Sequence, residues 1–128
     1  MTKLPLLAVL LFIGASAFAQ TQTEKEIKDL LAHKWKLTHV EVGGQKMEVP
    51  AGVGDSFLDF KADGTILKID SEEEQKGKWV YDHKTKIITT EDKDGTEKYE
   101  IIKISETEFS FKVTDEGQKI TMTLKRVN

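Results

Sequence analysis

The sequence predicts an all-β fold, an eight-stranded antiparallel up-and-down barrel preceded by one short helix. Residues 20–128 contain 7 Val, 9 Ile and 12 Thr against 6 Leu and 3 Ala, and β-branched side chains favour strands. The same segment divides into eight short runs separated by tight turns, a spacing typical of a meander. Closing such a meander into a barrel removes its two unpaired edges.

Residues 1–19 have the three parts of a secretory signal peptide. Lys3 is a short basic region, residues 4–13 form an apolar run, and Ala17-Phe18-Ala19 is the small-x-small pattern that signal peptidase cleaves. The run is shorter than the roughly 20 residues that a membrane span needs. We therefore expect cleavage before Gln20, no membrane anchor afterwards, and a single exported domain over residues 20–128, periplasmic or secreted.

Composition narrows the function further. The formal net charge is −3 with scattered basic residues, which disfavours nucleic acid and anionic membranes as partners. The chain has no Cys, so disulfides, thiolate metal sites and a lipidated N-terminal Cys are excluded. No catalytic or phosphate-binding motif is present, and the three His lack a metal-ligand spacing. We expect no enzyme activity, no cofactor and no metal.

The first predicted element of the exported domain is a short helix. Thr23 can cap it and Glu26 can complete a capping box. Ile27, Leu30 and Leu31 then share one face. The helix should end by Lys34.

Eight strands are predicted after the helix, with Gly-containing turns between several of them. Residues 43–55 form a loop, and residues 72–75 form either a solvated turn or a polar strand edge. Bulges are expected at Phe57-Leu58 and Ile101-Ile102, where the alternation is mixed. The predicted runs are 35–42, 56–61, 65–70, 77–82, 86–91, 97–104, 108–114 and 119–127.

The last two runs alternate most regularly. Phe109 and Phe111 in one run, and Ile120, Met122 and Leu124 in the next, should be buried and paired across the hairpin at Glu116-Gly117. Asp92-x-Asp94-Gly95 is interpreted as another hairpin turn, because the positions where a calcium loop needs acidic ligands are Thr90 and Ile101. The acidic residues 70 and 72–74 are interpreted as a solvated face.

Five aromatic residues are the candidate ligand-binding residues. Their positions match the inward phase of the strands, so they could line an apolar pocket for a small molecule. Alternatively they fill the barrel, since an eight-stranded barrel has an interior just wide enough for side chains or for one small ligand. The five are Trp79, Tyr81, Tyr99, Phe109 and Phe111.

Trp35 and Arg126 form a second candidate pair. Trp35 begins the first strand and Arg126 lies near the end of the last, so a closed antiparallel barrel brings them together at one rim. A guanidinium can stack on an indole. The pair would either contact a ligand or close one end of the barrel, and we favour the second interpretation.

Several short motifs occur along the exported domain. They are Leu31-x-x-x-Trp35-x-Leu37, Phe57-x-x-Phe60-x-x-Asp63-Gly64-Thr65, Gly77-x-Trp79 and the late Arg126. Together they resemble the motifs of small secreted lipocalin-like domains of Bacteroidetes bacteria. That family has a Gly-x-Trp motif in the first strand and a basic residue in the last strand that packs over the Trp. Trp35 and Arg126 match these two positions, but His33 stands where the family has Gly. The resemblance implies a β-barrel or half-open barrel and the binding of a small apolar ligand.

Two functions follow as hypotheses. The first is an exported protein that binds a small apolar molecule inside or at the mouth of the barrel. The second is a ligand-free envelope interaction module acting through surface loops 43–55 and 70–76. An internal cavity would favour the first, and a solid core with an exposed apolar patch would favour the second.

Overall fold

The computed structural model describes residues 22–49 and 55–127, so the predicted leader lies outside the described residues. No helix in this part of the chain is long and apolar enough to cross a membrane. The elements are α2 (Glu24–Leu31), β1 (Lys34–Val42), β2 (Gln45–Glu48), β3 (Ser56–Phe60), β4 (Thr65–Asp70), β5 (Glu73–Asp82), β6 (Ile87–Asp92), β7 (Gly95–Ile104), β8 (Glu108–Asp115) and β9 (Gln118–Val127).

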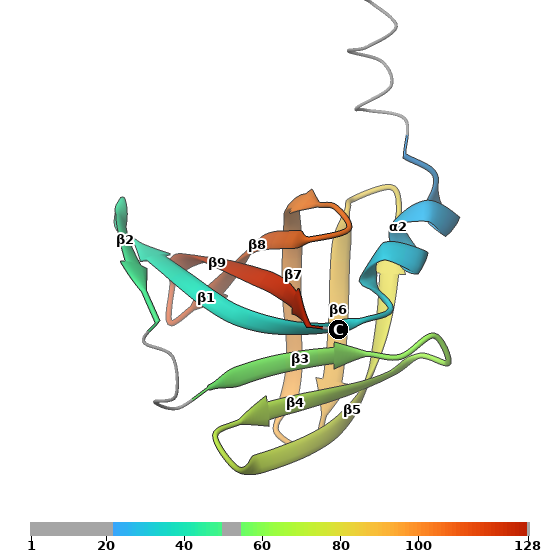
Figure 1. The fold of residues 1–128 in the computed structure, drawn as a ribbon, viewed down its shortest axis with the longest axis horizontal. Helices are drawn as coiled ribbons and strands as arrows, with labels where there is room; N and C mark the ends of the chain where they lie inside the picture. Colours follow the sequence, from blue (N-terminus) through green and yellow to red (C-terminus); the bar gives the residue numbers. More distant parts are fainter. Residues whose placement is uncertain (1–21, 50–54, 128) are drawn as a thin grey trace, which may run out of the picture.

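The strands form the closed eight-stranded barrel that the sequence predicts (Figure 1). From β3 to β9 each strand pairs antiparallel with the next in the chain. β1 pairs with β3 through Lys34–Lys36 and with β9 from Lys34↔Val127 to Val42↔Ile120. The β1–β9 ladder closes the sheet, so the first and last barrel strands leave no open edge between them.

β2 was not predicted. Residues 45–48 fall in the segment expected to be a loop, yet they pair with β1 from His39↔Glu48 to Val42↔Gln45. Gly43 and Gly44 have positive φ values of 59° and 83°, which glycine adopts at little cost and a tight hairpin requires. The four residues are exposed and show no apolar alternation, so the usual strand signal was absent.

β5 is longer than predicted, and residues 70–76 are not a loop. β4 runs to Asp70 and β5 begins at Glu73, so the turn consists of Ser71 and Glu72. Of the two alternatives for residues 72–75, the polar strand is correct for residues 73–75. Glu73 and Glu74 are exposed, which allows a strand without an apolar alternation.

The predicted helix and its capping box are confirmed. The Thr23 hydroxyl accepts a hydrogen bond from the Glu26 N–H at 3.1 Å, and the Glu26 carboxylate accepts one from the Thr23 N–H at 3.0 Å. Ile27 and Leu31 are buried. The indole N–H of Trp35 donates to the Leu31 carbonyl at 3.1 Å, which fixes the end of α2 to the start of β1.

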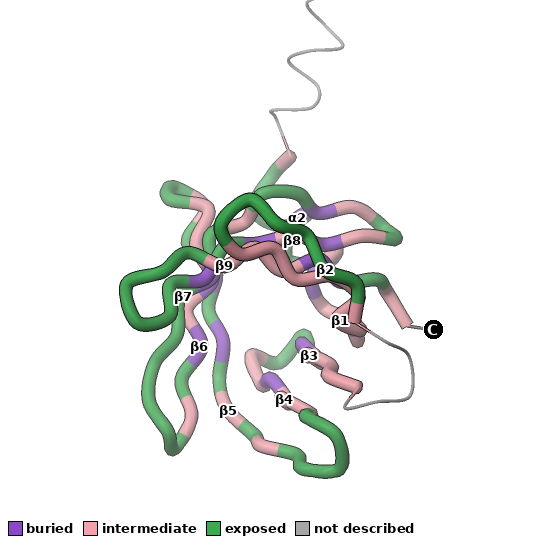
Figure 2. Tube along the Cα trace, turned by 90° about the vertical axis from the view of Figure 1, so that its left-hand side faces the viewer, coloured by how far each residue is buried: buried purple, intermediate pink, exposed green. Residues whose placement is uncertain are grey.

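An aromatic cluster fills the part of the barrel next to α2. Phe109 lies at its centre, with ring centroids 5.5 Å from Trp35 and 6.0 Å from Phe60. Phe60 meets Trp79 edge-on at 5.4 Å. Figure 2 shows the buried residues within the strands, where they alternate with partly exposed and exposed ones, whereas the turns and β2 are mostly exposed. This half of the barrel is therefore a core filled by buried aromatic side chains.

The strand register agrees with the prediction for the last hairpin. Phe109 pairs with Leu124 and Phe111 with Met122. Phe109, Phe111 and Leu124 are buried as predicted, whereas Ile120 and Met122 are only partly buried. The expected bulge near Ile101-Ile102 is confirmed by a register shift between Ile101 and Lys103. The prediction of a bulge at Phe57-Leu58 is wrong, because β3 pairs regularly with β4 there. A bulge lies instead in β1, between Leu37 and His39.

Candidate functional site

The barrel has two different ends. The helix end carries α2 and the turns at residues 61–64, 83–86 and 105–107, whereas the open end carries the turns at residues 71–72, 93–94 and 116–117. In Figure 1 α2 and the β4–β5 turn lie on opposite sides of the barrel. Since the aromatic cluster fills the helix end, any space for a ligand inside the barrel lies toward the open end.

A pocket of about 230 Å³ lies in this open half, and we call it the mouth pocket. Tyr99 and Phe111 stack in its wall with ring centroids 4.3 Å apart. Most of its lining is apolar and comes from β1, β3, β7, β8 and β9. The main apolar residues are Leu37, Leu58, Tyr99, Phe111, Val113, Met122 and Leu124.

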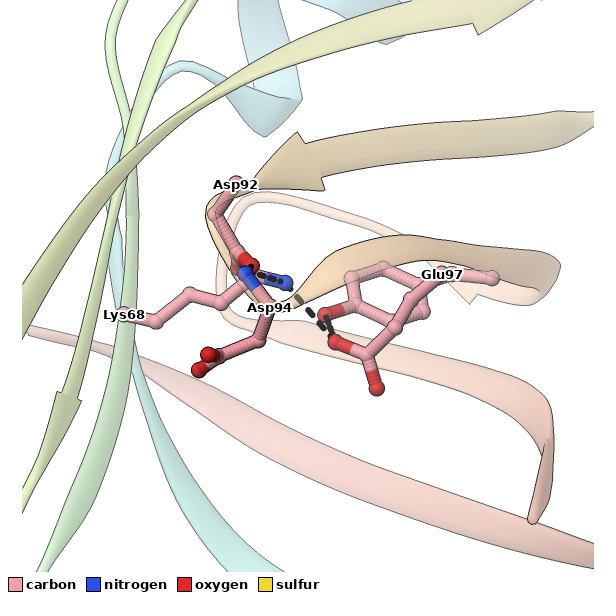
Figure 3. Close-up of polar contacts among 5 residues, drawn as sticks. Lys68, Asp92, Asp94 and Glu97 are labelled. Carbon is pink, nitrogen blue, oxygen red and sulfur yellow. Dashed lines mark hydrogen bonds and ion pairs between the residues drawn. The ribbon is translucent and has the colours of Figure 1, made fainter. Parts of the chain in front are cut away.

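The mouth pocket also has a polar wall, in which Lys68 contacts two carboxylates (Figure 3). The Lys68 ammonium lies 2.7 Å from Glu97 Oε1 and 3.0 Å from Asp92 Oδ2. The Tyr99 hydroxyl donates to the same Glu97 oxygen at 3.3 Å. The Asp92 carboxylate is only 6% exposed and the Lys68 side chain 18%. The pocket therefore joins an apolar wall to a charged one, in which Lys68 and Asp92 are nearly buried and Glu97 is half exposed.

The protonation states in this wall follow from these contacts. Burial alone would lower the pKa of Lys68, but its hydrogen bonds to Glu97 and Asp92 outweigh burial and raise it. The Lys68 hydrogen bond lowers the pKa of Asp92. Burial, with the nearby Glu97 charge, raises the pKa of Tyr99 to about 12. At neutral pH the wall contains an ammonium, ionised Asp92 and a neutral phenol.

Little in the sequence indicates that Lys68 is part of this site. In β4 the side chains of Ile66, Lys68 and Asp70 face the interior, because they pair with inward residues of β3. The intervening Leu67 and Ile69 are also apolar, so the period of two did not show which face was inside. Asp92 was interpreted only as a turn residue. It does form that turn, accepting from the Asp94 N–H at 2.8 Å.

The five aromatic residues predicted to bind a ligand lie in three different places. Tyr99 and Phe111 line the mouth pocket, and Phe109 is fully buried in the aromatic cluster. Trp79 and Tyr81 border an outer groove between α2 and the β3–β4 turn. The indole of Trp79 donates to the Lys61 carbonyl at 2.9 Å. The two alternatives for these aromatics, pocket lining and core filling, thus apply to different members of the set.

Trp35 and Arg126 are directly opposite each other in the β1–β9 ladder. Trp35 is fully buried, while the Arg126 guanidinium donates to the Glu106 carbonyl at 3.4 Å. Within residues 22–49 and 55–127, cations lie over aromatic rings at Lys34–Phe57 and Lys68–Tyr99, so the predicted stacking of Arg126 on Trp35 is not observed. Burial and the nearby Arg126 charge lower the pKa of His33.

Comparison with known families agrees with this architecture. The family model described as a lipocalin-like domain matches residues 31–111. The chain belongs to the lipocalin-like family. The resemblance to lipocalin-like domains is thereby confirmed, and β9, which lies beyond the matched segment, completes the barrel by pairing with β1. No match was found among curated proteins.

The charged wall of this lipocalin-like domain should contribute to stability in a pH-dependent way. Asp92→Asn removes the charge but keeps an oxygen for the Asp94 N–H. Because the pKa of Asp92 is lowered on folding, its contribution is present above the unfolded value of about 3.9 and is lost as the pH falls through the folded value. We expect the variant to lose about 1 kcal/mol of unfolding free energy at pH 7.

Urea unfolding across pH 7 to pH 2 measures this effect. The difference between wild type and Asp92→Asn should shrink as the pH falls below about 4. Asp94→Asn is the control, because Asp94 is exposed in the same turn and should change stability little. A difference that stays constant down to the lowest pH would contradict the assigned role of the Asp92 charge.

Proposed function

We propose that this lipocalin-like domain binds a small molecule with an apolar body in the mouth pocket. The observation that carries the proposal is the contrast between the two barrel halves. The helix end is filled by fully buried aromatic side chains, whereas the open half keeps about 230 Å³ of space beside Tyr99 and Phe111. Apolar pockets with a few convergent polar groups are the usual form of small-molecule sites.

The size of the pocket limits the ligand. Pockets for drug-sized molecules usually measure about 300–1,000 Å³, so the mouth pocket suits a smaller ligand or one whose tail enters and whose head stays at the rim. The apolar wall supplies affinity by removing ligand surface from water. We propose binding without catalysis, because Lys68 and Glu97 of the pocket are joined in an ion pair and the Ser56 hydroxyl donates to the Asp70 carboxylate at 3.1 Å.

Fluorescence of 1-aminoanthracene, a small neutral dye at pH 7, tests the proposal. We expect saturable enhancement with a Kd of about 1–100 μM, in line with the modest affinity of ligands of this size. Val113→Phe adds a ring at a residue that lines the mouth pocket, and should weaken dye binding by about tenfold, roughly 1.4 kcal/mol.

Val80→Phe is the matched control for this experiment. Val80 lies on β5 and is 65% exposed on the outer surface, so the same added ring should leave dye binding unchanged. Thermal melting checks that both variants fold. If wild type binds no dye, or if Val113→Phe binds as well as Val80→Phe, binding in the mouth pocket is wrong and the ligand-free interaction module becomes the better hypothesis.

We also propose that the protein is exported, to the periplasm or beyond the cell, and that it acts in that compartment. The proposal rests on the signal-peptide pattern of residues 1–19 and on the resemblance to secreted domains of Bacteroidetes. N-terminal sequencing of the exported protein should begin at Gln20 or its cyclised form. Recovery of the chain only inside the cell, with Met1 retained, would contradict export.

A further inference from the structure

The charge of Lys68 is already neutralised within the protein. Its ammonium contacts two carboxylates, Glu97 at 2.7 Å and Asp92 at 3.0 Å. One positive charge thus faces two negative ones, and Asp70 adds a further carboxylate to the lining of the mouth pocket. An anionic ligand head would therefore find no uncompensated cation here, although the pocket contains a lysine.

The turns around the open end are acidic as well. Residues 70–73, 92–95 and 115–118 contain one basic residue, Lys93, and seven acidic ones. The turns at the helix end, counted with the same one-residue flanks as 60–65, 82–87 and 104–108, are mixed, with Lys61, Lys84 and Lys86 against Asp63, Asp82, Glu106 and Glu108. The acidic residues of the open end are Asp70, Glu72, Glu73, Asp92, Asp94, Asp115 and Glu116.

Glu97 is the carboxylate best placed to meet a ligand. It lines the mouth pocket, and its side chain is 51% exposed whereas that of Asp92 is nearly covered. Lys68 and Tyr99 both bond to its Oε1 atom, and no bond to Oε2 is found within the described residues. A donor group that enters beside Tyr99 would meet an acceptor and an excess of negative charge.

We propose that the mouth pocket selects ligands with a positively charged head, such as a primary ammonium on an apolar body. The inference rests on the proposed binding function and specifies its ligand class. The apolar body lies against Phe111, Met122 and Leu124, and the head lies at the rim near Glu97 and Asp70. The acidic turns raise the local concentration of cations and accelerate their encounter with the pocket.

Competition against bound 1-aminoanthracene tests the head charge. Octylammonium, octanol and octanoate share one tail and differ at pH 7 only in the head. We expect octylammonium to displace the dye at a concentration at least about tenfold below octanoate, with octanol between them. The ratio of the octanoate concentration to the octylammonium concentration needed to displace the dye should fall as salt increases, because the Debye length drops to about 10 Å at 0.1 M ionic strength.

Glu97→Gln and Glu100→Gln form a matched pair of variants. Both glutamates are on β7 and about half exposed, at 51% and 54%, but Glu97 lines the pocket whereas Glu100 lies near Lys119 at 3.9 Å on the outer surface. We expect Glu97→Gln to reduce the ratio of octanoate to octylammonium concentrations by about threefold or more. Glu100→Gln should leave that ratio within experimental error.

The possible results separate this inference from the binding function. Dye displacement by octanoate or octanol at concentrations equal to or below that of octylammonium overturns the cationic-head inference and leaves apolar binding intact. An unchanged ratio in Glu97→Gln overturns it too. Absence of dye binding in wild type overturns the binding function itself, and the ligand-class inference with it.

Discussion

Phe109→Ala should reduce the free energy of unfolding by about 3–5 kcal/mol. Phe109 is fully buried and its ring contacts three other rings, those of Trp35, Phe60 and Phe111, at centroid distances of 5.5, 6.0 and 5.1 Å. Truncation leaves a cavity, which the surrounding strands of the barrel can close only in part. Since small domains have about 5–15 kcal/mol of total stability, the variant should be near the limit of folding.

Urea unfolding followed by Trp fluorescence measures this loss, because Trp35 lies beside the new cavity. Ile102→Ala on the neighbouring β7 is the control, since Ile102 is 50% exposed and its truncation should cost less than about 0.5 kcal/mol. Phe111→Ala should cost less than Phe109→Ala, because Phe111 also borders the mouth pocket. A Phe109→Ala loss below about 1 kcal/mol would show that the helix end is loosely packed.

The fold was predictable because its local signals agree with one another. The capping box at Thr23 and Glu26 determines where α2 begins, and the alternation from Phe109 to Leu124 determines the register of the last hairpin. The missed strand β2 and the undecided start of β5 have a common cause. β2 and the first part of β5 are polar and exposed, so their backbone ladders form without the apolar period that identifies strands in a sequence.

The candidate site was less predictable because it depends on long-range pairing. Aromatic residues at inward positions were correctly expected to be buried, yet phase alone does not distinguish Phe109, which fills the helix end, from Phe111, which borders the pocket. That distinction depends on distance along the barrel from α2. The Lys68 contacts join residues separated by 24 and 29 positions, which no local motif indicates.

Gly77→Ala should reduce the free energy of unfolding by about 2–3 kcal/mol, although it adds one methyl group. Gly77 lies in β5 opposite Ile66. A Cβ atom at this position would be 2.5 Å from the Glu91 carbonyl oxygen and 3.1 Å from Asp92 Cβ. The nearer atom is backbone, so a side-chain rotation cannot relieve the collision. β5 and β6 must separate beside the carboxylate that holds Lys68.

Thermal and urea unfolding of Gly77→Ala, compared with Lys78→Ala, test this expectation. Lys78 is the adjacent, exposed residue on the same strand, so its truncation reports the effect of Ala in β5 without the collision and should be near neutral. Movement of β6 would also displace Asp92 from Lys68, so Gly77→Ala should weaken the acid dependence of stability that Asp92 confers. Equal stability of the two variants would contradict the close approach of β5 and β6 at Gly77, because an added methyl would then have been accommodated without a shift of either strand.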